Sequence, residues 1–307
     1  MLLLVVLLAS GLRAAVEVRE IPANPTLGFH WPYLLVAPAQ PVRPTFLVVE
    51  PNNSSTGSDD QAFHLQMAHK AIVRSTSHPG FQQLGLPYLM PVFPRPRAQW
   101  KYYTHALDRD TLEWRESGME RIDLQLVAMV EDARRRLAAE GIPTEKKIFL
   151  WGYSAGGSFT IRFTLLHPDR VQAASVGGCA VPPIPLAKVH GQSARYPIGV
   201  ADLKQLTGQK FNAEGFRRVP IQIFRGAADN NDEVAFADGY DVADRDFINR
   251  TLGGPPPIER YPAIQALYRR AAPQVKFTIE PGVGHNDALT RKETPVFFEQ
   301  QRRQKRR

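Results

Sequence analysis

Residues 147–157 read KIFLWGYSAGG, an apolar run followed by a glycine-rich turn. The apolar part is typical of a buried strand, and a helical pattern follows over residues 156–166. Between the two lies a G-x-S-x-G pattern with Ser154 at its centre. A turn this tight has no room for side chains at the flanking positions, and it exposes the serine hydroxyl at the carboxyl end of the strand. We therefore predict that Ser154 is a catalytic nucleophile; the alternative is an ordinary glycine-rich turn between a strand and a helix.

Segments typical of strands and of helices alternate on both sides of this motif. Apolar residues spaced by three and four predict a helix at residues 122–137, which Gly141 and Pro143 then end. Strands are expected at residues 46–50, 86–93, 147–151, 171–176, 219–224 and 275–279. Nearly continuous apolar strands that alternate with helices indicate a mostly parallel sheet with helices on both faces. The predicted fold class is therefore α/β.

The length and composition suit one large domain. The chain has 307 residues, of which 43% are hydrophobic, and this is enough for a single large core. We expect one domain over residues 16–307, with additional edge structure at residues 16–44. A proline-rich segment at residues 181–218 is expected to form a short cap-like insertion over the site. A basic tail is expected at about residues 300–307.

The N-terminus has the pattern of a signal peptide. Residues 2–8 are an unbroken apolar run, and most of the residues that follow as far as Ala15 (ASGLRAA) are small. This run is too short to span a bilayer and predicts a signal peptide at residues 1–15; a buried N-terminal strand is the alternative. The protein would then be secreted or periplasmic, and sequencing of the mature chain should begin near Ala15 or Val16. Cys179 is the only cysteine, so no intrachain disulfide can form.

The charge does not indicate a nucleic-acid partner. The net charge is +8, but the basic residues are scattered among acidic ones except in the C-terminal tail. No nucleic-acid-binding motif accompanies them, and a solvated surface explains the charge. We therefore expect neither a nucleic-acid partner nor a membrane span. The sequence leaves the oligomeric state open.

A catalytic serine on this kind of turn needs a base, which follows it and the acid in the chain. Three histidines come after Ser154. His167 lies about three turns along the following helix, and His190 lies in the proline-rich insertion. His285 lies in a glycine-bearing loop just past the last predicted strand. His285 is therefore the predicted base.

The acid is expected after the next-to-last predicted strand, where residues 225–234 read RGAADNNDEV. Asp229 follows the strand by a short glycine turn, so its carboxylate can face the imidazole and hold the required tautomer. Asp232 and Glu233, one turn later, are the alternatives. This acidic cluster is not expected to bind calcium, because Val234 stands where a calcium loop needs glycine.

Two backbone N–H groups must stabilise the oxyanion of the tetrahedral intermediate. One is expected from Ala155, the residue after the nucleophile. The other is expected from the turn PNNSS at residues 51–55, and Asn53 is the predicted donor. Asn52 and Asn53 also begin N-x-Ser glycosylation sequons, but a glycan there would block the proposed site. The turn interpretation is therefore preferred.

These three catalytic segments together resemble the α/β-hydrolase superfamily. They are GYSAGG at residues 152–157, the Gly226-x-x-Asp229 step and the Gly284-His285 pair. Within the superfamily they are most similar to secreted esterases related to polyhydroxybutyrate depolymerases and feruloyl esterases, over about residues 44–299. The resemblance implies the α/β-hydrolase fold and acyl-enzyme chemistry without a cofactor or metal. It also implies a small-molecule or polymeric ester substrate. The usual His-Gly oxyanion motif is replaced by Pro51-Asn52, and the disulfides of many secreted relatives are missing.

Two other functions are compatible with the motifs. A serine peptidase could use the same fold, although residues 16–44 are too short for the large N-terminal propeller that such peptidases often carry. A binding protein could also retain the fold without catalysis. A complete set of Ser154, Asp229 and His285 in the right order argues against it.

Overall fold

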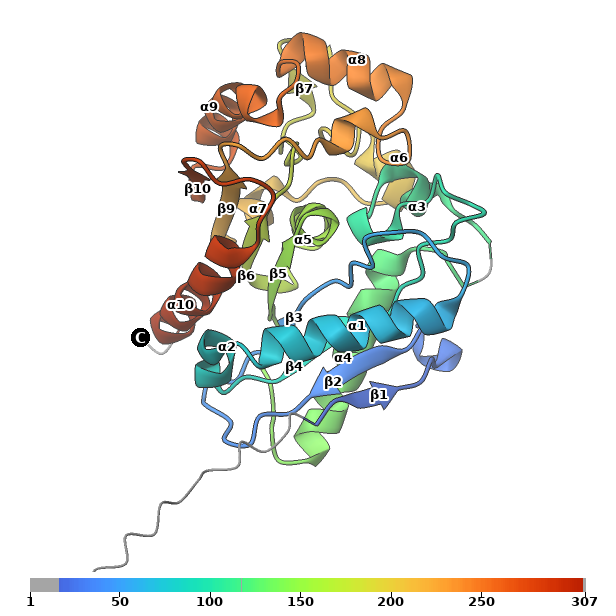
Figure 1. Cartoon of the computed structure of the whole chain (residues 1–307), viewed down its shortest axis with the longest axis vertical. Helices are drawn as coiled ribbons and strands as arrows, with labels where there is room; N and C mark the ends of the chain where they lie inside the picture. The colour runs from blue at the N-terminus through green and yellow to red at the C-terminus, as the bar shows by residue number, and fades with distance from the viewer. Residues whose placement is uncertain (1–16, 117, 306–307) are drawn as a thin grey trace, which may run out of the picture.

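A single mixed sheet forms the centre of the computed structural model, which describes residues 17–116 and 118–305 (Figure 1). The strands in this part of the chain lie in the order β1-β2-β4-β3-β5-β6-β9-β10. Their bounds are β1 (Arg19–Ile21), β2 (Tyr33–Val36), β3 (Val48–Val49), β4 (Tyr88–Pro91), β5 (Ile148–Tyr153), β6 (Val171–Gly177), β9 (Ile221–Gly226) and β10 (Val275–Glu280). The six strands from β4 to β10 in this order are parallel to one another. Strand β2 pairs antiparallel with both of its neighbours, β1 and β4. The predicted α/β class is confirmed.

The predicted strands all exist, but two are shorter than expected. The run at residues 46–50 contributes only Val48 and Val49 to β3, and the run at residues 86–93 pairs only over residues 88–91. The flanking apolar side chains are nevertheless buried. Residues 16–44 were expected to add edge structure, and β1 and β2 do so.

Helices cover both faces of the sheet (Figure 1). The apolar side chains of α1, α2 and α10 pack with one core cluster, and those of α4, α5 and α9 pack with the other. The helix bounds are α1 (Gln61–Thr76), α2 (Pro79–Leu84), α3 (Arg109–Glu113), α4 (Ile122–Ala139), α5 (Ala155–Leu166), α6 (Leu203–Thr207), α7 (Ala213–Arg217), α8 (Val242–Thr251), α9 (Tyr261–Ala271) and α10 (Ala288–Gln304). None of the helices in the described ranges is long and apolar enough to cross a membrane.

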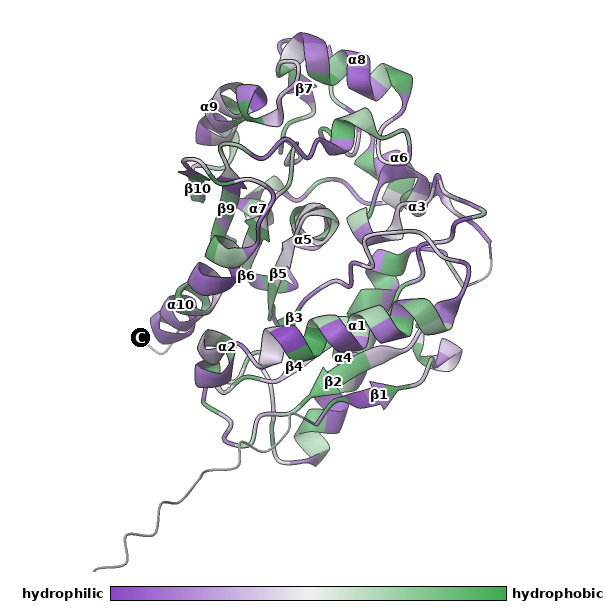
Figure 2. Ribbon diagram, in the orientation of Figure 1, coloured by the Kyte–Doolittle hydropathy of each residue, from purple (hydrophilic) through white to green (hydrophobic). Residues whose placement is uncertain are grey.

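The side-chain pattern of each element explains which face it buries. Along β5, Ile148 and Leu150 belong to one core cluster, whereas Phe149 and Trp151 belong to the other. This alternation follows from the two-residue period of a strand, and it requires an apolar residue at every position. Hydrophobic and hydrophilic bands alternate along α1 (Figure 2), as expected of a helix with one buried face.

The insertion at residues 181–218 folds against the main core. It contains the short hairpin of β7 (Lys188–Val189) and β8 (Gln192–Ser193), together with α6 and α7. Its apolar side chains, such as Tyr196, join the larger core cluster. Asp202 makes an ion pair with Arg109 of α3, and Arg195 makes one with Asp244 of α8. The insertion is therefore packed against the rest of the domain.

The predictions for the two chain ends can be compared with the structure to different extents. The predicted signal peptide, residues 1–15, lies outside the described residues, so export stays a prediction. Residues 300–304 of the predicted basic tail form the end of α10, which continues to Gln304. Arg302 is buried there and binds both Glu299 and the backbone oxygen of Arg43. The side chain of Arg302 is buried and its charge is paired, so this residue is part of the folded domain.

Candidate active site

Ser154 lies at the sharp turn between β5 and α5. Its backbone has φ 59° and ψ −126°, a conformation that is strained for a residue with a side chain. Glycines make the turn possible. A Cβ atom on Gly152 would lie 2.3 Å from the Gly156 oxygen, and one on Gly157 would lie 2.2 Å from the Gly177 oxygen. The expected strand–turn–helix geometry at the G-x-S-x-G motif is therefore present.

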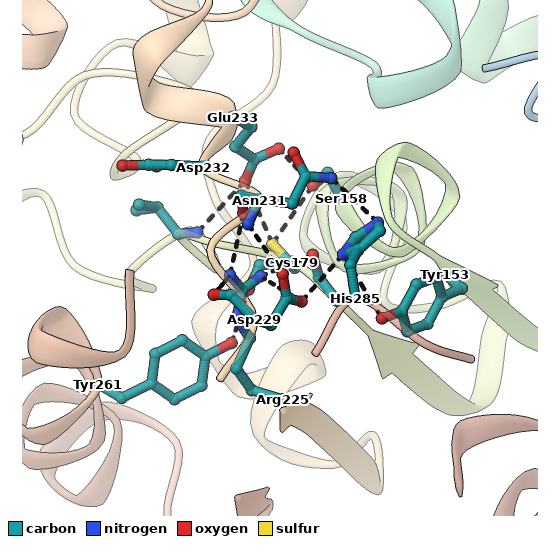
Figure 3. A network of polar contacts seen from close by, with 12 residues as sticks. Tyr153, Ser158, Cys179, Arg225, Asp229, Asn231, Asp232, Glu233, Tyr261 and His285 are labelled. Carbon is teal, nitrogen blue, oxygen red and sulfur yellow. Dashed lines mark hydrogen bonds and ion pairs between the residues drawn. The ribbon is translucent and has the colours of Figure 1, made fainter. Parts of the chain in front are cut away.

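Asp229 and His285 meet although 56 positions separate them. Asp229 follows β9 and His285 follows β10, and the two strands are neighbours in the sheet. The His285 Nδ1 atom lies 2.9 Å from the Asp229 Oδ2 atom (Figure 3). The loops themselves are held together, since the Ala228 N–H donates to the Val283 oxygen at 2.9 Å. An ionised Asp229 accepts the Nδ1 proton, which leaves Nε2 as the basic nitrogen of the imidazole.

The basic nitrogen of His285 faces Asn231, a residue that the sequence analysis missed. The amide nitrogen of Asn231 lies 3.0 Å from His285 Nε2, and the Asn231 backbone N–H donates to Asp229 Oδ1 at 2.9 Å. Ser154 and His285 line the same cavity. The hydrogen bonds within residues 17–116 and 118–305 include none between these two side chains. Catalytic hydrogen bonds often form fully only with substrate bound, and Asn231 holds the imidazole until then.

Arg225 is a buried positioning residue for the acid. Its guanidinium group donates to the backbone oxygens of Asp229 at 2.7 Å, Asn231 at 2.9 Å and Gly178 at 3.0 Å (Figure 3). It also lies 3.2 Å from the Asp229 carboxylate. Burial by itself would raise the pKa of Asp229. The hydrogen bond from His285 and the charge of Arg225 outweigh burial, so the pKa lies below its usual value. No local sequence signal distinguishes Arg225 from other strand arginines.

Arg225→Met should lower kcat/KM by roughly ten- to hundredfold, because the acid loop loses hydrogen bonds to a charged group. Loss of the nearby cation also disfavours the charged form of Asp229. The acidic limb of the pH profile of kcat/KM should therefore move to higher pH. Arg225→Lys, which keeps the charge, should leave that limb near its original position. Equal pH profiles for all three proteins would contradict the positioning role.

The turn after β3 brings the second predicted oxyanion donor next to the nucleophile. Asn53 and Ser154 line one cavity. The Pro51 oxygen lies 3.4 Å from where a Cβ atom on Gly156 would be, so the turn and the start of α5 are in close contact. Within the described ranges, no group accepts a hydrogen bond from the backbone N–H of Asn53. Ala155, the other predicted donor, is the first residue of α5, where backbone N–H groups have no partner in the helix.

Buried side chains hold this turn in place. The Asn52 amide pairs with both backbone groups of Phe93, at 2.9 Å and 3.1 Å. His105 donates from Nε2 to the Phe93 oxygen at 2.9 Å, and its Nδ1 faces the N–H of Ser54. The Ser54 hydroxyl in turn lies 2.9 Å from Nδ1 of His64. Burial lowers the pKa of His105 to about 3, so its imidazole is neutral and can both donate and accept. A buried Asn52 also leaves no room for a glycan.

The cavity beside Ser154 has a volume of about 350 Å³. It lies between the turn after β3, the last turns of α1 and the start of α10. Its lining residues are Glu50, Pro51, Asn53, Ser55, Ala71, Arg74, Met90, Tyr153, Ser154, His285, Asn286, Asp287 and Arg291. None of them comes from residues 181–218, all of which the structure describes. The apolar side chains of this insertion are buried against the core, and its role as a cap stays a prediction.

The alternative acids and histidines have other partners. Asp232 makes two bonds of 2.7 Å and 2.8 Å to Arg260, which is buried. Glu233 accepts from the Ser158 hydroxyl at 2.7 Å, behind the nucleophile turn. His167 pairs with Asp123 at 2.8 Å. His190 is exposed in the insertion. In the described ranges, three or more histidine, cysteine or acidic side chains nowhere come together in a way that could hold a metal ion.

Comparisons with known proteins give matches in structure. No protein-family model matches the chain, and no curated protein matches it. A poly(3-hydroxybutyrate) depolymerase from Bordetella parapertussis is similar, with TM-score 0.60, 18% identity, and 93% of this chain and 90% of that one covered. Poly(aspartic acid) hydrolase-1 from a Sphingomonas species has TM-score 0.58 and 16% identity, over 94% and 97% of the two chains. An S-formylglutathione hydrolase from Agrobacterium tumefaciens has TM-score 0.51 and 13% identity, over 93% and 94%.

These likenesses extend over nearly the whole chain, and each of them is to a hydrolase. At such low identities they establish the architecture, which agrees with the strand order and with the position of the serine turn. The resemblance inferred from the sequence motifs is confirmed at this level. The chain adopts the α/β-hydrolase fold.

Proposed function

We propose that the protein is a serine hydrolase that cleaves carboxylic esters through an acyl-enzyme intermediate. The observation that carries the proposal is the pairing of His285 with Asp229 at the cavity that also contains Ser154. Ser154 is strained, exposed to the cavity and placed at the N-terminus of α5, where negative charge is favoured. These are the features that nucleophilic catalysis by serine requires.

In the proposed first half-reaction, Ser154 attacks the ester carbonyl and His285 takes the serine proton. For this step Nε2 of His285 must exchange its contact with Asn231 for one with Ser154. The N–H groups of Ala155 and Asn53 stabilise the oxyanion, and His285 gives its proton to the departing alcohol. In the second half-reaction His285 activates water, which releases the acid and restores Ser154.

The structural neighbours support acyl chemistry as the reaction class. Their names describe a depolymerase of a polyester, a hydrolase of poly(aspartic acid) and a hydrolase of S-formylglutathione. All three compounds are carboxylic acid derivatives. A fold can carry unrelated activities, so the proposal for this chain depends on its own site residues.

An active-site-directed fluorophosphonate probe tests the proposal. The probe should label the folded protein, and mass spectrometry should find the label on the peptide that contains Ser154. Heat-unfolded protein is the control and should stay unlabelled. An absence of labelling in the folded protein would favour a non-catalytic binding protein.

A matched pair of substrates then separates an esterase from a peptidase. We expect 4-nitrophenyl butyrate to be cleaved faster than the corresponding butyryl 4-nitroanilide, which differs in the scissile bond. Faster cleavage of the anilide would favour a peptidase.

A further inference from the structure

Charged side chains form much of the cavity wall beyond the catalytic residues. Arg74 comes from the last turn of α1, Asp287 and Arg291 come from the start of α10, and Glu50 follows β3. The apolar contribution is somewhat less than the polar one and comes from Pro51, Ala71, Met90 and the ring of Tyr153. A long alkyl chain in this space would remove water from charged groups without offering them hydrogen bonds, which is unfavourable.

Asp287 binds both arginines of the wall. Its Oδ1 atom accepts from Arg74 at 2.7 Å, and its Oδ2 atom accepts from Arg291 at 2.8 Å. Arg291 has further partners, since it donates to the Ser75 hydroxyl at 2.8 Å and lies over the Trp151 ring. Burial alone would raise the pKa of Asp287. The hydrogen bond and charge of Arg291, with the charge of Arg74, keep the pKa below its usual value. Asp287 is thus one anion shared by two cations.

Glu50 is the other acidic side chain of the wall. Its carboxyl group is buried and accepts a hydrogen bond from the Tyr88 hydroxyl. That hydroxyl in turn accepts from the Trp151 indole at 2.5 Å. Burial raises the pKa of Glu50, although the charge of Arg291 acts against this effect. Glu50 is therefore held by its neighbours away from solvent, and its carboxyl group offers little exposed charge to a substrate.

Arg74 is the most exposed of the four charged side chains of this wall. Its side chain is 63% exposed, and the bond to Asp287 uses only one of its terminal nitrogens. A guanidinium group has five N–H donors, so Arg74 can bind a second anion while it keeps Asp287. Arg291 is only 11% exposed and has its donors directed at Asp287 and Ser75. Arg74 is consequently the group that a substrate can reach.

We propose that this cavity selects esters that carry a carboxylate group, which binds Arg74 while the ester carbonyl lies at Ser154. The selection rests on the proposed function and defines its substrate class. A carboxylate suits the site because charge-assisted hydrogen bonds to a guanidinium group are strong and directional. The carboxylate can belong to the acyl part or to the alcohol part of the ester, and the two arms of the test distinguish these sources.

The test measures kcat/KM for two pairs of esters, with the spontaneous rate subtracted. The acyl pair is 4-nitrophenyl hydrogen succinate and 4-nitrophenyl butyrate, which differ by a carboxylate in place of a methyl group. The alcohol pair is 4-acetoxybenzoate and 4-methylphenyl acetate, which differ in the same way. For each pair we take the ratio of kcat/KM of the anionic ester to that of the neutral ester. In at least one pair this ratio should fall about five- to tenfold in Arg74→Gln, mainly because KM for the anionic ester rises.

Two further variants make the result specific. Asp287→Asn keeps the shape but removes the competing anion, so the same ratio should rise. Arg218→Gln is the matched control, because Arg218 is 65% exposed and also makes one ion pair, with Glu214 on the same helix surface. It should leave the ratio unchanged. Thermal unfolding of each variant verifies that it is folded at the assay temperature.

Failure of this inference differs from failure of the proposed function. If the neutral esters are hydrolysed and the ratio is the same in Arg74→Gln as in the original protein for both pairs, the carboxylate selection is refuted. A fall of the ratio in Asp287→Asn would refute it as well. If none of the four esters is hydrolysed by the folded protein, the proposed esterase function itself is refuted.

Discussion

Ser154→Ala should lower kcat/KM for 4-nitrophenyl butyrate by several powers of ten, down to the level of residual binding and oxyanion stabilisation. Loss of the serine in a protease with the same set of groups costs roughly six powers of ten in kcat. The reason is that no other hydroxyl can form the acyl-enzyme at this position. Alanine keeps the same backbone conformation at the turn, so the midpoint of thermal unfolding should change little. Steady-state kinetics and a thermal unfolding curve measure both quantities.

Ser158→Ala is the matched control for this variant. It removes another serine hydroxyl from the same helix, one that binds Glu233 and does not line the cavity. We expect kcat/KM to stay within a few-fold of the original value. Full activity in purified, folded Ser154→Ala would overturn the assignment of the nucleophile, and with it the proposed mechanism.

Asp229→Asn should cost about four powers of ten in kcat, as the same change does in a well-studied serine protease. Asparagine fills the same space at 2.9 Å from His285 Nδ1. However, its amide donates a hydrogen bond where the carboxylate accepts one, so the imidazole is held in the wrong tautomer. Loss of the negative charge also leaves Arg225 buried beside a neutral side chain. The comparison of kcat/KM on one ester at a pH near 8 measures the effect.

Asp232→Asn is the control, because the structure gives this carboxylate a different partner. Asp232 binds the buried Arg260 with two bonds. Removing one partner of a buried ion pair destabilises a protein by about 3–5 kcal/mol. We therefore expect a clear drop in the unfolding midpoint and a loss in kcat/KM below tenfold while the protein remains folded. A greater loss of kcat/KM in Asp232→Asn than in Asp229→Asn would show that Asp229 is not the acid.

Local sequence was enough to predict the architecture and to select Ser154, Asp229 and His285, which the fold brings to one edge of the sheet. The strand β5 could be predicted because its positions from Ile148 to Trp151 must all be apolar in a sheet covered on both faces. The turn at Ser154 could be predicted because only glycine fits at Gly152 and Gly157, where the backbone of another segment is too close for a Cβ atom. Asp229 and His285 could be chosen because the carboxyl ends of neighbouring parallel strands lie at one edge of the sheet. Their catalytic roles stay predictions until the variants are measured.

The insertion at residues 181–218 shows what composition leaves undetermined. Prolines between two strands are equally typical of a loosely attached cap and of a segment that packs against the core. Which of the two forms depends on side chains such as Tyr196, whose partners lie far away in the chain. The backbone oxygen of Leu107, about 90 positions earlier, accepts a hydrogen bond from the Tyr196 hydroxyl. Hydrophobic burial is not directional, so the sequence of a segment does not reveal which surface will cover it.

The charges around the serine were decided by the tertiary structure alone. Arg74 and Asp287 are 213 positions apart, and nothing near either residue indicates the other. Arg225 resembles any other arginine in a strand until the loops of Asp229 and Asn231 fold over its guanidinium group. The strand and turn patterns of this chain are set by short-range sterics and by the period of its apolar residues, and the sequence contains them. Ion pairs between distant segments form only once the sheet has placed those segments side by side, so the arrangement of charges around the cavity is set by the tertiary structure.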